Sequence, residues 1–100
     1  MKNILLVCNA GMSTSMLVKK MQDAAKSENI DVNIEAKSLT EAKKSIDSAD
    51  MILVGPQIRY ELNNLKKVAQ DIPVEAINMQ DYGMMNGKKV LKEALKAMGV

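Results

Sequence analysis

Four short apolar segments, each followed by a stretch whose apolar residues recur at helical spacing, constrain this chain more than any other feature. Two of the segments, Ile4–Val7 and Met51–Val54, are continuous apolar runs, which is typical of strands covered by helices on both faces. The other two, Asp31–Ala36 and Pro73–Ile77, alternate between apolar and polar residues, as strands at the edge of a sheet do. The pattern predicts that the first and third segments lie in the middle of a sheet.

The four intervening stretches each offer one apolar stripe for burial. The stripes consist of Leu17, Met21, Ala24 and Ala25; of Leu39, Ala42 and Ile46; of Ile58, Leu62, Leu65 and Ala69; and of Leu91, Ala94, Leu95 and Met98. Before the second stretch, Ser38 and Glu41 stand at the spacing of a capping box, which marks a helix start. Strands alternating with helices over short connections predict a parallel sheet with right-handed crossovers.

The predicted fold is therefore α/β: a three-layer sandwich with a four-stranded parallel sheet of order 2-1-3-4 and two helices on each face. Right-handed crossovers put the first and last helices on one face and the second and third on the other. The gap between the first and third strands becomes the topological switch point, where we expect a ligand cleft. The 100 residues have room for a single domain, 1–100.

Composition narrows the chemistry that such a domain can perform. The chain has no histidine and one cysteine, which excludes serine–histidine, cysteine–histidine and histidine–metal sites and an internal disulfide. A lone cysteine suits a reducing compartment, and no apolar run is long enough for a membrane span, so we expect a cytoplasmic location. A net charge of +2 and two aromatic residues argue against nucleic-acid binding. We expect no metal and no cofactor.

The segment at the predicted switch point carries the candidate chemistry. It consists of Cys8, Asn9, Ala10, Gly11, Met12, Ser13, Thr14 and Ser15. A junction between a buried strand and a helix aims free backbone N–H groups and the positive end of the helix dipole at one point, which favours a bound phosphate. Gly11 permits the tight turn. The three hydroxyl residues that follow can donate hydrogen bonds to the same anion.

Cys8 stands at the rim of this predicted phosphate cradle, where the same field favours the thiolate and makes it the nucleophile. Two plainer interpretations stay open: a lone cysteine that ends a strand is often a small core residue, and serine or threonine commonly caps a helix. The loop lacks the Gly-Lys-Ser/Thr of a Walker loop and the repeated glycines of a dinucleotide fingerprint, so nucleotide binding is disfavoured.

The whole chain resembles the cytoplasmic B component, enzyme IIB, of the lactose/cellobiose type of the bacterial phosphoenolpyruvate-dependent sugar phosphotransferase system. The matching motifs are the loop Cys8–Ser15, the segment Leu53–Ile58 and the pair Tyr82-Gly83. The resemblance implies that Cys8 accepts a phosphoryl group from a phosphohistidine of the IIA component, with Asn9–Ser15 as the phosphate cradle. It also implies transfer onward to a sugar, of the β-linked disaccharide kind, bound by the membrane-embedded IIC component.

By this resemblance the chain is a protein-phosphocysteine–sugar phosphotransferase, held at the inner face of the membrane through IIC.

Three alternatives stay open. The loop also resembles that of low-molecular-weight tyrosine phosphatases, but their phosphate-binding arginine is replaced by Thr14, which favours a carrier over rapid hydrolysis. A receiver-like regulatory domain needs an acidic metal site at the strand ends, whereas here Cys8 and Gly55 follow the central strands. A redox protein would need a Cys-x-x-Cys pair.

Two residues outside the loop are further candidates for contact with a partner or with the groups around the phosphate. Gln57 follows the other central strand, so its amide is expected to border the cleft, although Gly55 and Pro56 are equally natural turn residues. Tyr82 is expected in the loop after the fourth strand, where a partner contact and core packing are both open interpretations.

Two further features bear on partners. Arg59, near the start of the third predicted helix, could reach an approaching phosphate or an acidic partner, although a solvated cation is the plainer expectation. Several of the nine methionines lie near the thiol loop or the last strand–helix connection, namely Met12, Met16, Met79, Met84 and Met85. Methionines that are left exposed around Cys8 would form an adaptable surface suited to docking two partners in turn.

Overall fold

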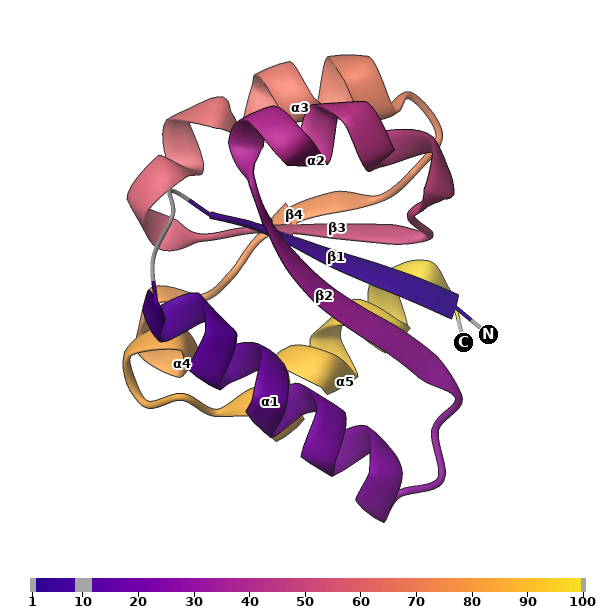
Figure 1. Cartoon of the computed structure of the whole chain (residues 1–100), viewed down its shortest axis with the longest axis vertical. Helices are drawn as coiled ribbons and strands as arrows, with labels where there is room; N and C mark the ends of the chain where they lie inside the picture. Colours follow the sequence, from indigo (N-terminus) through magenta and orange to yellow (C-terminus); the bar gives the residue numbers. More distant parts are fainter. Residues whose placement is uncertain (1, 9–11, 100) are drawn as a thin grey trace.

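A parallel four-stranded sheet forms the middle of three layers (Figure 1). The computed structural model describes residues 2–8 and 12–99. The strands are β1 (Lys2–Cys8), β2 (Val32–Ser38), β3 (Met51–Val54) and β4 (Val74–Ala76). Their order is β2-β1-β3-β4, and every neighbouring pair is parallel. The predicted strand order is confirmed.

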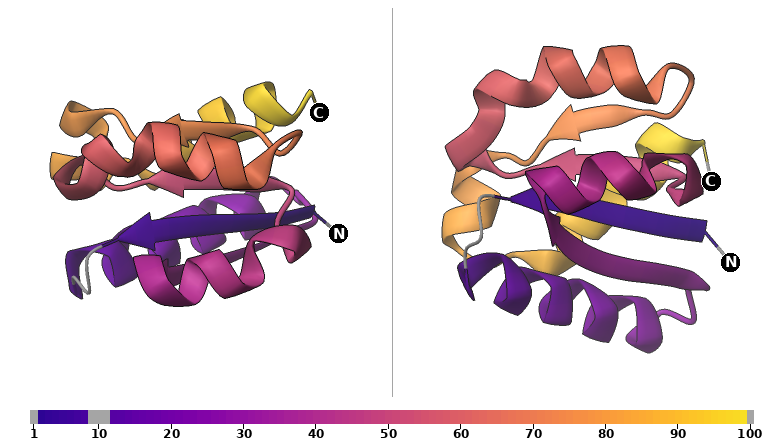
Figure 2. Two further views of the ribbon diagram at one scale, coloured as in Figure 1. Left: turned by 90° about the horizontal axis from the view of Figure 1, so that it is seen from above. Right: turned by 45° about the horizontal axis from the view of Figure 1, so that its top comes forward.

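The helices cover both faces of this sheet (Figures 1 and 2). They are α1 (Met12–Ser27), α2 (Leu39–Ser45), α3 (Leu62–Ala69), α4 (Met79–Gly83) and α5 (Gly87–Met98), with two 3-10 turns, η1 (Ile46–Ser48) and η2 (Pro56–Glu61). Helices α1 and α5 pack on one face, and α2 and α3 on the other, as the crossover rule predicts. The short helix α4 is an addition to the prediction.

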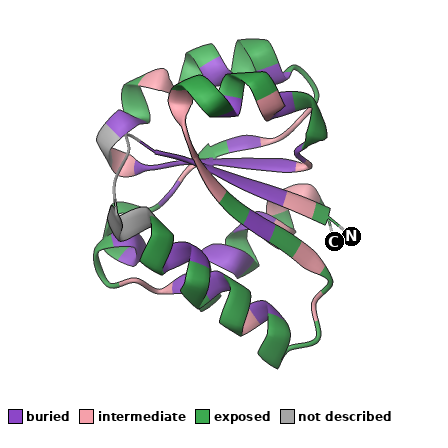
Figure 3. Ribbon diagram, in the orientation of Figure 1, coloured by how far each residue is buried: buried purple, intermediate pink, exposed green. Residues whose placement is uncertain are grey.

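Alternate residues of β1 enter two separate cores. Ile4 and Leu6 pack with α1 and α5, whereas Leu5 and Val7 pack with α2 and α3. All of β3 is buried, while β2 and β4 each have one buried residue and otherwise half-buried or exposed ones (Figure 3). The continuous apolar runs are therefore central strands and the alternating ones are edge strands.

The start of the third helical stretch differs from the prediction. The chain first forms η2, with Pro56 in its first turn, and Ile58 has non-helical backbone angles of φ −121° and ψ 30°. Regular α-helix begins only at Leu62. Ile58 is nevertheless buried in the core, because the tighter 3-10 segment still turns the apolar side chain at this position toward the sheet.

Side-chain caps mark the starts of α2, α4 and α5, with Asn86 as the cap of α5. The Ser38 hydroxyl accepts a hydrogen bond from the Glu41 backbone N–H at 3.4 Å, which confirms the predicted cap of α2. The Asn78 side-chain oxygen accepts from the N–H groups of Gln80 (2.9 Å) and Asp81 (3.2 Å). This cap starts α4 immediately after the fourth strand, where the sequence predicted a loop.

Candidate functional site

All four strands end at one side of the sheet, at Cys8, Ser38, Val54 and Ala76. We call this side the carboxyl edge; it lies on the left in Figure 1, where α1, η2 and α4 begin. The sheet ladder continues one residue past β3, because the Gly55 N–H donates to the Val7 carbonyl at 2.9 Å. The backbone of the two central strands is thus fixed up to the point where the candidate site begins.

Cys8 is the last residue of β1 and pairs in register with Ser38 of β2. By strand alternation its side chain lies on the same face as Ile4 and Leu6, the face that α1 and α5 cover. The residue is 6% exposed, and its Sγ donates a weak hydrogen bond to the Lys37 carbonyl oxygen at 3.8 Å. Reaction at this sulfur therefore requires that the thiol give up that bond.

The structure describes only the later part of the predicted phosphate cradle, Asn9–Ser15. The residues between β1 and α1, Asn9, Ala10 and Gly11, lie outside the described residues. For Met12, Ser13 and Thr14 the backbone is described and the side chains are not. Because α1 begins at Met12, the predicted hydroxyl residues lie inside its first turn, where backbone N–H groups have no partner within the helix. Ser15 in this turn is exposed.

The structure describes the side chain of only one of the two further candidates. Gln57 lies in η2, and its side chain is not among those described. Tyr82 lies in α4, is 8% exposed and packs in the core beneath α1 and α5. Packing accounts for the position of Tyr82, and its contact with a partner stays a prediction.

A hollow of about 390 Å³ opens at the carboxyl edge between η2 and the start of α4. It is lined by Pro56, Arg59, Ala76, Ile77, Asn78 and Met79, and we call it the Arg59 hollow. The Arg59 side chain is exposed, as the sequence predicted. Within the described part of the chain no hydrogen bond or ion pair holds its guanidinium group.

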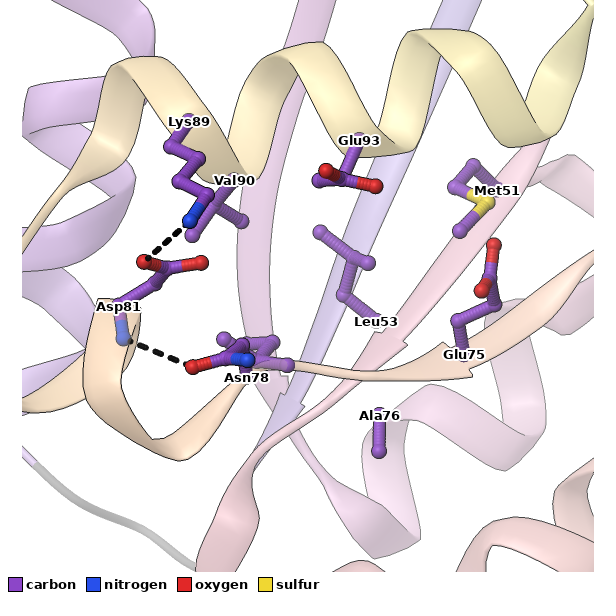
Figure 4. A pocket seen from close by; sticks show the side chains of 10 residues that line it. Met51, Leu53, Glu75, Ala76, Asn78, Asp81, Lys89, Val90 and Glu93 are labelled. Carbon is purple, nitrogen blue, oxygen red and sulfur yellow. Dashed lines mark hydrogen bonds and ion pairs between the residues drawn. The ribbon is translucent and has the colours of Figure 1, made fainter.

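A second hollow, of about 240 Å³, lies beside β4 on the face that α5 covers (Figure 4). Its lining combines apolar residues such as Met51 and Leu53 with the acidic residues Glu75 and Glu93. On its rim Lys89 Nζ lies 3.6 Å from Asp81 Oδ1, and the side chains of Lys89 and Asp81 are 57% and 8% exposed. We call this the Lys89 hollow. Its cation is paired with the Asp81 carboxylate of the same chain.

A metal-binding cluster and a membrane-spanning helix are both absent from the described residues. Across residues 2–8 and 12–99, no three or more His, Cys, Asp or Glu side chains gather where they could hold a metal ion. In the same ranges no helix is both long enough and apolar enough to cross a bilayer. The strand ends themselves carry no carboxylate, so the acidic site of a receiver domain has no counterpart there.

The architecture defines the class: a small parallel α/β domain with its single cysteine at the topological switch point. The sequence profile of the family described as "PTS system, Lactose/Cellobiose specific IIB subunit" matches residues 3–93. The chain therefore belongs to this family of IIB components of the sugar phosphotransferase system (PTS), and the resemblance inferred from the sequence is confirmed. IIB components are sugar phosphotransferases that work with IIA and IIC components.

Similar proteins cover nearly the whole chain. The oligo-beta-mannoside-specific EIIB component of Bacillus subtilis (strain 168) is 44% identical over 100 residues, which are 98% of this chain and 97% of the relative. The solution structure of a cellobiose-specific IIB component from Borrelia burgdorferi has 47% identity and a TM-score of 0.82, covering 98% of this chain and 92% of that one. The lactose-specific IIB domain from Streptococcus pneumoniae shares the fold, with a TM-score of 0.87 at 18% identity and 96% coverage of each chain.

Proposed function

We propose that Cys8 is a phosphoryl carrier: it accepts the group from a phosphohistidine of the IIA component and delivers it to a sugar bound by the membrane-embedded IIC component. The observation that supports this most directly is the position of the only cysteine, at the end of β1 on the edge where α1 begins. Membership of the IIB family implies phosphoryl transfer to a sugar, and a thiol is the strongest nucleophile that this histidine-free chain offers.

In the proposed site the phosphate is held by the residues from Asn9 to Ser15. Helix α1 has 16 residues and begins at Met12, so its free N–H groups and dipole favour a dianion at this end. The loop contains no arginine. Backbone dipoles and hydroxyl groups would therefore carry the charge that develops during transfer. Gln57 and Tyr82 stay candidates for contact with a partner.

The first transfer is an in-line displacement. The N–P bond of the partner's phosphohistidine breaks as the S–P bond to Cys8 forms, and the thiol proton passes to the released imidazole. In the second transfer a sugar hydroxyl forms an O–P bond, the S–P bond breaks, and the hydroxyl proton goes to a base. Because the chain has no histidine, we propose that IIC supplies this base and holds the IIB component at the inner face of the membrane.

The sugar is proposed to be a β-linked disaccharide. The similar proteins are named for oligo-beta-mannoside, cellobiose and lactose, so the family serves several glycosides. A carrier whose phosphoryl group leaves from a thiolate needs only to present that group to the acceptor hydroxyl. The specificity for one sugar would then lie in IIC, which binds it.

Intact-mass analysis after incubation with phosphorylated IIA tests the carrier directly. We expect one added phosphoryl group on the native chain and none on Cys8→Ser, because a neutral hydroxyl is a far weaker nucleophile than a thiolate. The substitution is nearly isosteric, so thermal unfolding of the variant should match the native chain. With IIC and a β-glucoside present, the label should move to the sugar.

Two results would contradict the carrier. Labelling of Cys8→Ser at the native rate would show that another residue accepts the group. Rapid release of inorganic phosphate from the native chain without IIC, or turnover of an aryl phosphate, would assign a thiol phosphatase instead.

A further inference from the structure

Exposed apolar side chains are concentrated at the carboxyl edge. Among the residues whose side chains are described, the large exposed hydrophobic ones are Met16, Tyr60, Val68, Met79 and Met84. All except Val68 lie on the first turns of α1, on η2, or on α4 and its C-cap. Val68 lies near the far end of α3. Apolar exposure grouped in this way marks a surface that another molecule covers.

Arg59 adds to this apolar surface an exposed cation that no described residue pairs. Tyr60, the next residue, is 77% exposed, and Met79 across the Arg59 hollow is 71% exposed. An arginine stays charged at any working pH and can bind a carboxylate or phosphate with two parallel hydrogen bonds. The neighbouring thioether side chain adapts its shape at low cost. The hollow therefore fits a partner that brings an anion inside an apolar contact area.

The Arg59 hollow lies close enough to Cys8 to be covered by a partner that reaches the sulfur. Strands β3 and β4, whose ends border it, lie one and two positions from β1 in the sheet, or about 5 and 10 Å away. A typical interface buries about 800 Å² on each partner, which corresponds to a disc of about 16 Å radius. A protein whose contact area of this size is centred on Cys8 therefore also covers the Arg59 hollow.

We propose that Arg59, Tyr60 and Met79 form the docking surface for the phosphohistidine-bearing IIA component, with Arg59 bound to an anionic group of that donor. This inference rests on the proposed function and adds to it the surface and the contact chemistry. The donor is favoured as the occupant because it arrives carrying a phosphoryl dianion. The exposed Arg59 guanidinium, with which no described residue pairs, attracts such a group.

The rate at which phosphorylated IIA labels the chain tests this surface. Below saturation, Arg59→Ala and Met79→Ala should each slow labelling about tenfold, equivalent to about 1.4 kcal/mol of docking energy. At saturating donor the rate should recover, since docking and not chemistry is lost. Arg59→Ala should also make the rate less sensitive to salt. Lys67→Ala and Val68→Ala on α3 remove an exposed cation and an exposed apolar group away from the edge, and should stay within twofold of the native rate.

Each other outcome overturns the assignment. If Cys8 is labelled and both edge variants match the native rate, the docking surface is wrong while the carrier stands. If labelling by IIA is unchanged but delivery to the sugar is slowed, the surface belongs to IIC. If the native chain accepts no phosphoryl group, the carrier and the docking surface fail together. Thermal unfolding of each variant separates these results from misfolding.

Discussion

The two hollows beside β4 differ in whether their cation has an anionic partner among the described residues. In the Lys89 hollow the ammonium group lies 3.6 Å from a carboxylate that is 8% exposed. In the Arg59 hollow no described residue pairs with the guanidinium. A buried carboxylate needs a partner for the fold to be stable, whereas an exposed unpaired arginine contributes little to folding. Lys89 therefore contributes to the stability of the fold, whereas Arg59 is available to bind another molecule.

The largest effect on stability is expected at Gly87, which sets the position of the wall of the Lys89 hollow. A Cβ at this position would lie 2.6 Å from backbone atoms of Lys20 and Met21, so α5 would have to move away from α1. Gly87→Ala should lower the free energy of unfolding by about 3 kcal/mol, measured by urea denaturation.

The chain offers a matched control for this substitution. A Cβ on Gly83, in α4, would meet no atom of the other described elements within 4 Å, and the residue has no positive φ. Gly83→Ala should leave stability unchanged or raise it by up to about 0.5 kcal/mol. Equal losses for the two variants would show that the close approach of α5 to α1 is not what fixes this wall.

An intermediate effect is expected at Lys89. Lys89→Ala leaves the buried Asp81 carboxylate without its cation, and because the lysine is 57% exposed the loss should be about 1 kcal/mol. Lys88→Ala, one residue earlier and also exposed, should cost less than half of this. Adding Asp81→Asn to Lys89→Ala should recover part of the loss, because the second change removes the orphaned charge. Strict additivity would refute the pairing.

The smallest effect on stability is expected at Arg59. Because nothing described in the fold holds its side chain, Arg59→Ala should change the free energy of unfolding by less than about 0.5 kcal/mol. The same variant is expected to slow labelling by IIA. A stability loss as large as that of Lys89→Ala would end the distinction between the two hollows.

The strand order was predictable because the burial of a strand determines the pattern of apolar residues in its sequence. The runs Ile4–Val7 and Met51–Val54 are apolar at every position since helices cover both of their faces. Helix α4 was missed because its five residues are too few to show a helical period, although Asn78 supplied a capping signal. The 3-10 geometry of η2 was missed because Ile58 keeps the same apolar spacing to Leu62 and Leu65 in either kind of helix.

The positions of the candidate residues were predictable where they follow one strand and unpredictable where two elements meet. The place of Cys8 at the end of β1 was predicted from the buried run before it, and its role stays a proposal. The Arg59 hollow combines η2 with residues 76–79, which local patterns cannot bring together. The sequence therefore favoured a solvated Arg59 over one that reaches a phosphate or an acidic partner. Tyr82 was expected in a loop at the ligand side, and its burial depends on the unpredicted helix α4.

The two edge strands have a practical consequence for experiments at high protein concentration. Strand β4 has three residues and follows Pro73, and β2 carries Glu35 and Lys37 at alternate positions. A short strand after a proline, and a strand with charges along it, are poor templates for a strand from another chain. The sheet is open at both sides, yet it is built to resist aggregation by strand addition.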